Sequence, residues 1–299
     1  MSERRTAVML MGYGTPRTPG DILPYYTDIR RGNAPSDKQL EELTARYAAI
    51  GGISPLAERS DAQRRAMQSA LDELANGRYH VVLGMKHAAP FIETSVAELA
   101  ADGFRSVVGL VLAPHYSAFS VGQYLDRLSA AAEPHAMAVH AIRSWATEPA
   151  FIDFIAEDVR VRRAALPAPT RVLFTAHSLP ERILLADDPY PVELRSTAEL
   201  VAGKLALDDW GIAWQSAGRT PEPWLGPDIL QVIDDLAAQG RAQSILVSAV
   251  GFVADHLEVL YDLDIEAARR AGGHALTFDR TRCVNDDPPV MAALAARVV

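Results

Sequence analysis

The chain is poor in cysteine, in long apolar runs and in positive charge. Among its 299 residues there is one cysteine, Cys283, which excludes an internal disulfide framework and a cysteine-ligated cluster supplied by this chain alone. A reducing, cytoplasmic setting fits this cysteine usage. No apolar run approaches the ~20 residues that a membrane-spanning helix needs. The net charge of −9 argues against nucleic acid as the main partner.

Two further signals are missing near the amino terminus. The segment MSERRTAVML has no small-residue cleavage site, so it predicts a strand rather than a secretion signal. This also disfavours a periplasmic-type binding protein. The GYGTP sequence at residues 12–16 has neither the GxGxxG nor the GxxxxGK[ST] spacing, and it predicts a tight turn rather than a phosphate-binding loop.

Short aliphatic runs that end in Gly, His or Pro alternate with amphipathic helical patterns. The expected strands lie in TAVMLMGYGTP, HVVLGMKHAAP, SVVGLVLAPHYS, RVLFTAHSLP, GIAWQSAG and SILVSAVGFVADH. The expected helices lie in DKQLEELTARYAAI, DAQRRAMQSALDELA, FIETSVAELAADG and DILQVIDDLAAQG. Unalternated apolar strands separated by amphipathic helices predict an α/β fold with parallel sheets that are covered on both faces.

Two pairs of segments resemble each other and indicate an internal duplication. VVLGMKHAAP and VLFTAHSLP each place a histidine three residues before a proline at a strand end. SVVGLVLAPHYS and SILVSAVGFVAD each run from a strand into a loop and then a helix. We therefore expect two similar α/β halves, residues 1–161 and 162–299, joined by the Pro-Ala linker RRAALPAPTR at 162–171. Because ligands bind beyond the carboxyl ends of parallel strands, the cleft between the halves is the expected site.

The segment GFVADHLEVLYDLDIEA, residues 251–267, carries a row of acids in apolar surroundings. An arc of roughly 80° on an α-helix would hold Asp255, Glu258, Asp262 and Glu266. Like charges one turn apart repel by roughly 0.2–0.5 kcal/mol per pair, and an ordinary solvated face would be wider and mixed with lysines. The row therefore predicts a cation path or a proton-handling site.

Other polar residues allow both a structural and a functional interpretation. A lone histidine such as His177, at a strand end in TAHSLPE, is more often a capping or buried structural residue. Beside a carboxylate from an opposing strand end, it can share a proton or a metal. The arginines at positions 30, 31 and 46 are solvated surface if taken alone, but beside a cleft they could fork onto substrate carboxylates. The segment GRTPEPWLGPDI predicts a rigid loop that forms an apolar wall.

A series of segments, in order along nearly the whole chain, resembles one family. They are YGTP, YYTDIRRG, RYAAIGGISPL, GMKHAAPFI, LAPHYSAFSV, TAHSLPE, WQSAGRTPEPWLGPD and GFVADHLEVLYDLDIEA. The chain resembles the ferrochelatases, enzymes that insert Fe(II) into a porphyrin in haem biosynthesis. The resemblance implies two Rossmann-like, chelatase-type halves with parallel sheets and the porphyrin in the cleft between them.

The resemblance also implies roles for individual residues. His177 and Glu258 match the family's catalytic pair on the iron side, and Asp262 and Glu266 are similar to its outer metal-binding positions. Tyr13 matches the tyrosine of a bacterial subgroup that faces the iron from the opposite side of the macrocycle. That subgroup acts on coproporphyrin III, with four propionates, rather than on protoporphyrin IX, with two. The positions that hold the porphyrin, mostly in a segment at 24–56, correspond to Tyr13, Arg30, Arg46, Tyr47, Ser54 and Tyr124.

The family likeness also bears on cofactors and partners. Many ferrochelatases carry a [2Fe–2S] cluster on four cysteines; with Cys283 alone, no such cluster and no tightly bound cofactor are expected, and Fe(II) is a substrate. The chain ends near PPVMAALAARVV without the hydrophobic membrane lip of some relatives, so a cytoplasmic monomer without an integral membrane segment is expected. The expected partners are the porphyrin and Fe(II), with transient contacts to neighbouring haem-pathway enzymes.

The residue types suit metallation of a porphyrin. The reaction strips water from Fe(II) and removes two pyrrole protons; neutral imidazole and carboxylate are suitable bases and transient ligands. An apolar cleft excludes water, and a row of carboxylates passes a hydrated cation inward. The order in which His177 and Glu258 take protons stays open.

Three alternatives also stay open. The first is a protoporphyrin IX ferrochelatase. The second is a non-enzymatic haem or metal carrier that uses Tyr13 and His177 as ligands. The third is a cobalt chelatase for a sirohydrochlorin-like ring, although such proteins tend to show a paired-histidine site and lack the WQSAGRTPEPWLGPD wall.

Overall fold

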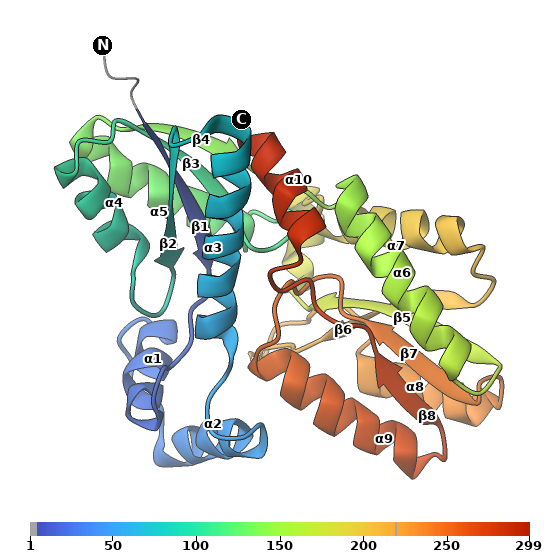
Figure 1. Ribbon diagram of the computed structural model, residues 1–299. Helices are drawn as coiled ribbons and strands as arrows, with labels where there is room; N and C mark the ends of the chain where they lie inside the picture. Colours follow the sequence, from blue (N-terminus) through green and yellow to red (C-terminus); the bar gives the residue numbers. More distant parts are fainter. Residues whose placement is uncertain (1–4, 219) are drawn as a thin grey trace.

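A computed structural model describes residues 5–218 and 220–299, and it shows two α/β halves side by side (Figure 1). Each half contains a four-stranded parallel sheet, with the orders β2-β1-β3-β4 and β6-β5-β7-β8. Numbered from its own first strand, each sheet therefore has the order 2-1-3-4. The two identical orders confirm the predicted duplication and the α/β fold class.

The central strands are buried apolar runs, as the sequence predicts. The first sheet contains β1 (Thr6–Gly12), β2 (Tyr79–Met85), β3 (Ser106–Val111) and β4 (Ala138–Ile142). The second contains β5 (Thr170–His177), β6 (Trp210–Gln215), β7 (Ser244–Ser248) and β8 (Thr277–Arg280). The sequence pattern does not predict β4 and β8, because both are short, partly exposed edge strands without a buried apolar run.

The correspondence between the halves differs from the prediction in one pair. β3 and β7 occupy equivalent places, as expected. β5, however, lies between β6 and β7 and so corresponds to β1, and the predicted match of VVLGMKHAAP with VLFTAHSLP is wrong. A histidine before a proline marks the end of a buried strand, but it does not fix which strands lie beside it. The correct match places Tyr13, just after β1, and His177, at the end of β5, at neighbouring positions of equivalent strands.

The helices cover both faces of each sheet. The first half contains α1 (Ile22–Ile29), α2 (Asp37–Ala49), α3 (Leu56–Ala75), α4 (Ile92–Ala101) and α5 (Val121–Ala132), with short 3-10 turns η1 (Pro19–Asp21) and η2 (Glu133–His135). The rest are α6 (Pro149–Ala165), the 3-10 helix η3 (Glu181–Ala186), α7 (Tyr190–Leu205), α8 (Ile229–Gln239), the π-helix η4 (Glu258–Ala267), α9 (Ala268–Gly273) and α10 (Pro288–Val298). The four helices predicted from the sequence are confirmed as α2, α3, α4 and α8.

Contacts between the halves hold the strand ends in place relative to one another. The last helix, α10, lies along α3 of the first half (Figure 1). One apolar cluster contains Val8 and Leu10 of β1 together with Phe174 of β5 and Leu294 of α10. The two halves therefore share a core.

The predicted boundary at 161/162 falls inside a helix. α6 continues to Ala165 and packs against α7 and β7, so the first part of the expected linker is helical. The division of the chain at this position remains a prediction. Within residues 5–218 and 220–299, no helix combines the length and apolarity that crossing a membrane requires.

Candidate active site

The centre of the candidate site is a histidine–carboxylate pair from the second half. His177 ends β5, and Glu258 is the first residue of η4. Nε2 of His177 lies 3.7 Å from Oε1 of Glu258, which is longer than a hydrogen bond. Nδ1 of His177 contacts the carbonyl oxygen of Ser178, and because a carbonyl only accepts, Nδ1 carries the proton. When the ring is neutral, its lone pair is therefore on Nε2, the nitrogen that faces Glu258.

A second histidine, His256, flanks the same carboxylate. Its Nε2 lies 3.7 Å from Oε2 of Glu258, and its Nδ1 donates to the carbonyl oxygen of Ala254 at 2.9 Å. Burial opposes the ionisation of Glu258, but the charge that His177 and His256 carry when protonated, a hydrogen bond from His256 and the charge of Arg46 outweigh it and lower the pKa of its carboxyl. Glu258 is thus a carboxylate between two imidazoles. The sequence reading missed His256, whose signal is its place two residues before Glu258.

The next two acids of η4 meet an arginine of the first half. Nη1 of Arg46, on α2, lies 3.3 Å from Oδ1 of Asp262, and its Nη2 lies 3.9 Å from Oε2 of Glu266. The hydroxyl of Ser216 also donates to Asp262. Burial is the main cause that raises the pKa of Asp262 to about 6. Ser216 and Arg46 oppose this shift, and the carboxylate of Glu258 adds to it. The chain itself therefore supplies a cation that reduces the repulsion between the outer acids.

The fourth acid of the predicted row lies elsewhere. η4 begins at Glu258 and is a π-helix, so the prediction that Asp255 shares an α-helical face with the other acids is wrong. Asp255 precedes the helix, where Arg280 contacts its Oδ1 at 3.1 Å and Asn285 donates to its Oδ2 at 2.9 Å. Both partners follow or end β8, and they turn this carboxylate toward that edge of the second sheet.

The raised pKa of Asp262 leads to a prediction about stability. An acid with a higher pKa in the folded protein than in the unfolded chain favours folding at low pH, and its contribution is lost as the pH rises through the window from about 4 to 6. Asp262→Asn removes this loss and is expected to stabilise the protein at about pH 7.5 by on the order of 1–3 kcal/mol. The advantage should shrink towards about pH 4. Urea unfolding at both pH values checks it; a gain that is constant with pH would contradict the shift.

Several tyrosines of the first half lie close enough to Glu258 for its charge to affect them. Tyr13 is 41% exposed, and its ring centre lies 6.4 Å from that of Tyr25 and 4.5 Å from that of His87. Tyr47 and Tyr124 are buried. For Tyr25, Tyr47 and Tyr124 burial raises the pKa, and the negative charge of Glu258 raises it further. The first half therefore presents protonated phenols within electrostatic reach of Glu258.

Two predicted porphyrin-binding residues make local contacts. Nε of Arg30 donates to the carbonyl oxygen of Asn33 at 3.1 Å, and its guanidinium lies 5.8 Å from the ring centre of Tyr26. The buried Ser54 accepts from the backbone N–H of Leu56 at 3.2 Å, at the start of α3. These contacts explain their conformations, and their role in binding propionates remains a prediction.

Aromatic rings stand beside the catalytic candidate. The ring centres of Trp224 and Phe252 each lie 6.5 Å from that of His177. Trp224 belongs to the loop that the sequence predicts as an apolar wall; Arg219 of the same loop lies outside the described residues. The His177–Glu258 pair therefore has apolar neighbours, which favour exclusion of water from it.

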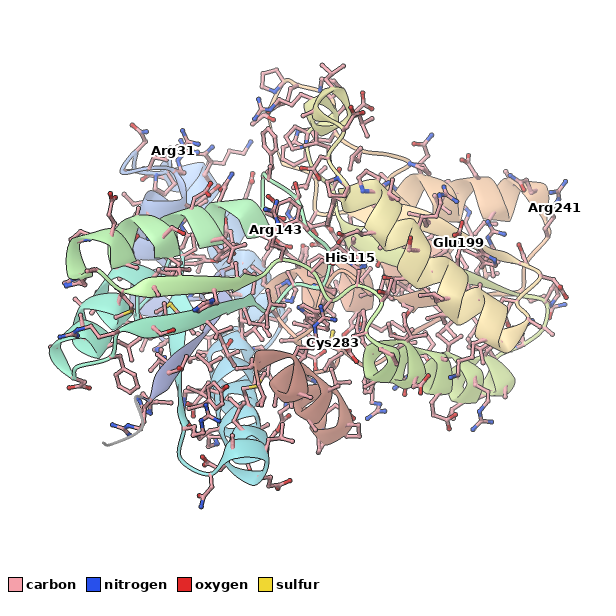
Figure 2. The ribbon with its side chains drawn as sticks, turned by 90° about the horizontal axis from the view of Figure 1, so that it is seen from above. Arg31, His115, Arg143, Glu199, Arg241 and Cys283 are labelled. Atoms are coloured by element: carbon pink, nitrogen blue, oxygen red, sulfur yellow. The ribbon has the colours of Figure 1, made fainter. Side chains whose placement is uncertain are left out.

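A cavity near the carboxyl end of β8 does not contain this pair. It measures about 670 Å³, and Asp255, Asp264, Arg280 and Cys283 are among its lining residues. Arg280 is already paired with Asp255 and Asp264, and Cys283 is buried in the interior near the middle of the molecule (Figure 2). Within residues 5–218 and 220–299, no group of three or more His, Cys, Asp or Glu side chains is arranged to hold a metal. The site is accordingly defined by the His177–Glu258 pair and the residues that face it.

Comparison with known proteins decides the family. The family model described as ferrochelatase matches residues 5–299. The chain belongs to the ferrochelatase family. This family member is 42% identical to the coproporphyrin III ferrochelatase of Geobacillus kaustophilus, over 100% of the chain and 96% of that protein. It is 40% identical to the coproporphyrin III ferrochelatase of Bacillus subtilis, over 100% of the chain and 98% of that protein. It is 43% identical to a Herpetosiphon aurantiacus protein named ferrochelatase, over 95% of each.

Solved structures of other chelatases share the fold of this ferrochelatase. SirB from Bacillus subtilis with Fe3+ superposes with a TM-score of 0.60 and 12% identity, covering 98% of the chain and 94% of SirB. CbiX, described as the terminal enzyme of sirohaem biosynthesis in denitrifying bacteria, superposes with a TM-score of 0.55 and 15% identity, covering 99% of each chain. At such identities the likeness shows the fold alone, and it confirms the predicted chelatase-type architecture. Family membership makes the chain an enzyme, a metal chelatase.

Proposed function

We propose that this ferrochelatase inserts Fe(II) into coproporphyrin III and produces Fe-coproporphyrin for haem biosynthesis. The observation that carries the proposal is full-length identity of about 40% or more with several relatives that bear this name. The site supports it, because Tyr13 of the first half and His177 of the second follow and end equivalent central strands. A flat macrocycle between the halves would meet the phenol on one face and the imidazole on the other.

The second half supplies the groups that handle protons and metal. Metallation replaces two pyrrole N–H bonds with bonds to the metal, so two protons leave for each Fe(II) that enters. The lone pair on Nε2 of His177 and the carboxylate of Glu258 are the nearest acceptors, and His256 flanks Glu258 on its other oxygen. The separation of 3.7 Å between His177 and Glu258 leaves both acceptors free for a proton or a metal ion, rather than bonded to each other.

The outer acids would receive the hydrated metal before it reaches this pair. Asp262 and Glu266 lie four and eight residues after Glu258 on the same helix and offer hard oxygen ligands. Arg46 occupies both in the protein alone, so a metal ion competes with an internal cation there. Binding at such a site is weak, as passage inward requires.

A double variant tests the entry role. Asp262→Asn with Glu266→Gln should raise the apparent KM for Fe(II) by about tenfold and lower kcat less than about threefold, because binding lost at an entry site appears in KM. Initial rates at varied Fe(II) and saturating porphyrin measure this. A defect in kcat with unchanged KM would place the two acids in the chemical step.

The substrate assignment is tested with two porphyrins. Purified protein is incubated anaerobically with Fe(II) and either coproporphyrin III or protoporphyrin IX in matched detergent, and absorbance spectra are followed. We expect kcat/KM for coproporphyrin III to be higher by at least about tenfold, equivalent to ~1.4 kcal/mol. Equal or faster turnover of protoporphyrin IX would replace the proposal with a protoporphyrin ferrochelatase. A single stoichiometric round without turnover would indicate a carrier.

We also propose that the enzyme works in the cytoplasm as a monomer, without a tightly bound cofactor or a [2Fe–2S] cluster. The proposed lack of a cluster is supported by the single cysteine, Cys283, which is buried. Porphyrin and Fe(II) are its proposed partners, together with transient contacts to neighbouring haem-pathway enzymes.

A further inference from the structure

Lys86, the first residue after β2, is a partly buried cation without a carboxylate partner. Its Nζ donates to Oε1 of Gln123 at 2.6 Å and lies 5.4 Å from the ring centre of Tyr124. In the described part of the chain, no carboxylate oxygen lies within 4.0 Å of this nitrogen. A neutral amide and an aromatic face are incomplete partners for an ammonium group, because its charge remains unbalanced.

The nearest charged groups do not supply the missing anion. Burial lowers the pKa of Lys86, and the positive charges of Arg127 and Arg31 lower it further. Glu93 lies near, but it forms two bonds of 2.8 Å to Arg127. Asp28 accepts a bond of 2.7 Å from His87, whose own pKa is lowered by burial. The carboxylates of Glu93 and Asp28 are thus already engaged, and neither forms an ion pair with Lys86.

A second cation without a carboxylate partner in the described residues stands nearby. Arg31 follows α1 and lies at the surface of the first half (Figure 2). Its backbone has φ +56°, a left-handed conformation that costs energy for a residue other than glycine and tends to persist at functional positions. The structure therefore holds two cations near one another, at an electrostatic cost.

This pair of cations borders the candidate active site. The backbone N–H of Lys86 donates to the carbonyl oxygen of Gly12, and that of His87 to the carbonyl oxygen of Tyr13, both at 2.9 Å. Lys86 is therefore fixed beside Tyr13 at the carboxyl end of the first sheet. Burial raises the pKa of Tyr124, the aromatic neighbour of Lys86, and the negative charge of Glu258 raises it further. The unbalanced ammonium lies within the set of side chains that surround the porphyrin in the proposed function.

Arg46, which is also expected to bind substrate carboxylates, is already occupied. Arg46 contacts Asp262 and Glu266, so it can hold a propionate only by leaving them or by sharing its charge. Lys86 has no such competitor.

We propose that Lys86 binds a propionate of the substrate, with Arg31 assisting electrostatically at the rim, and that this contact contributes to selection of a porphyrin with four propionates. The inference rests on the proposed function, because only the macrocycle supplies the carboxylate. A porphyrin with two propionates presents apolar groups at two of the four positions, and an apolar group at Lys86 would leave the ammonium desolvated and unpaired. Lys86 thus discriminates through the cost of the wrong partner as well as through attraction to the right one.

The test compares Lys86→Met with Lys86→Arg by fluorescence titration of metal-free coproporphyrin III and protoporphyrin IX. Lys86→Met should weaken binding of coproporphyrin III by about tenfold and of protoporphyrin IX by less than about twofold. Lys86→Arg keeps the charge and should remain within about threefold of wild type for both. The control Lys204→Met removes an exposed lysine that pairs with Asp153 on α6 and should change neither affinity.

Thermal unfolding of the porphyrin-free protein separates this role from a structural one. Lys86→Met removes an unpaired, desolvated charge, so its melting temperature should equal or exceed that of wild type; a lower value would overturn the proposal. Equal affinity losses for the two porphyrins, or no loss, would also overturn it.

Wild-type Fe(II) insertion is measured in parallel. If wild type metallates coproporphyrin III while Lys86→Met binds it normally, the inference about Lys86 fails and the proposed function stands. If wild type metallates neither porphyrin, the proposed function fails instead.

Discussion

His177→Ala and Glu258→Gln are each expected to lower the rate of metal insertion by at least about a hundredfold while porphyrin affinity changes by less than about threefold. The lone pair on Nε2 of His177 and the carboxylate of Glu258 face each other, and neither residue belongs to the set expected to hold the propionates. Their loss should therefore remove acceptors for protons and metal without removing the porphyrin site. Initial rates of Fe(II) insertion and porphyrin fluorescence titration measure the two quantities separately.

A matched control is available on the surface. His274 contacts Asp234 at 2.7 Å in an exposed pair remote from this chemistry, and His274→Ala should keep the wild-type rate. Retention of more than about a tenth of wild-type turnover by either His177→Ala or Glu258→Gln would show that the pair is not the catalytic centre.

Gly251→Ala is expected to have the second-largest effect, although glycine at this position carries no functional group. The backbone N–H of Gly251 donates to the carbonyl oxygen of Thr175 at 3.0 Å. A Cβ atom at Gly251 would lie 2.4 Å from Cβ and 2.7 Å from Cα of Ala176. Such an overlap with backbone forces the loop before η4 away from β5. His177 ends β5, and Glu258 begins η4 directly after this loop, so the distance between the two side chains must change.

The expected cost of Gly251→Ala is about 1–3 kcal/mol in the free energy of unfolding and at least about tenfold in the rate of metal insertion, because small misplacements of reacting groups are costly. Urea unfolding and initial rates measure the two effects. Gly203→Ala is the matched control: the added Cβ meets no atom within 4 Å on α7, and alanine favours the helix, so stability should stay equal or rise by up to about 1 kcal/mol. Wild-type stability and turnover in Gly251→Ala would contradict the close approach of the two elements.

The sequence predicts six of the eight strands, and it does not predict β4 and β8, which each form one edge of a sheet. Buried parallel strands are continuous apolar runs, so β1, β3, β5 and β7 are visible in the pattern. β4 and β8 are partly exposed edge strands, and nothing in their composition separates them from loops. The equivalence of β5 with β1 is also hidden, because it depends on which strands lie beside β5 rather than on the residues at its end.

The site divides in a similar way. The sequence predicts that His177 and Glu258 meet, and the distance of 3.7 Å confirms it; the roles of these two residues and of Tyr13 rest on the motifs that resemble the family and stay predictions. The place of Asp255 cannot be predicted, since the spacing of acids does not reveal where a π-helix begins. The contact of Arg46 with Asp262 joins residues far apart in sequence, and such pairing appears only when the halves are assembled.

The most direct test of the central claim is anaerobic mixing of Fe(II) with a preformed complex of the protein and coproporphyrin III, followed by absorbance and by a pH indicator. The account predicts catalytic conversion of the porphyrin spectrum to that of the iron complex, with about two protons released per metal inserted. The same experiment with Glu258→Gln should leave the free-porphyrin spectrum unchanged over many wild-type turnovers. A wild-type protein that leaves coproporphyrin III unmetallated, or a Glu258→Gln variant that converts it at the wild-type rate, would contradict the account.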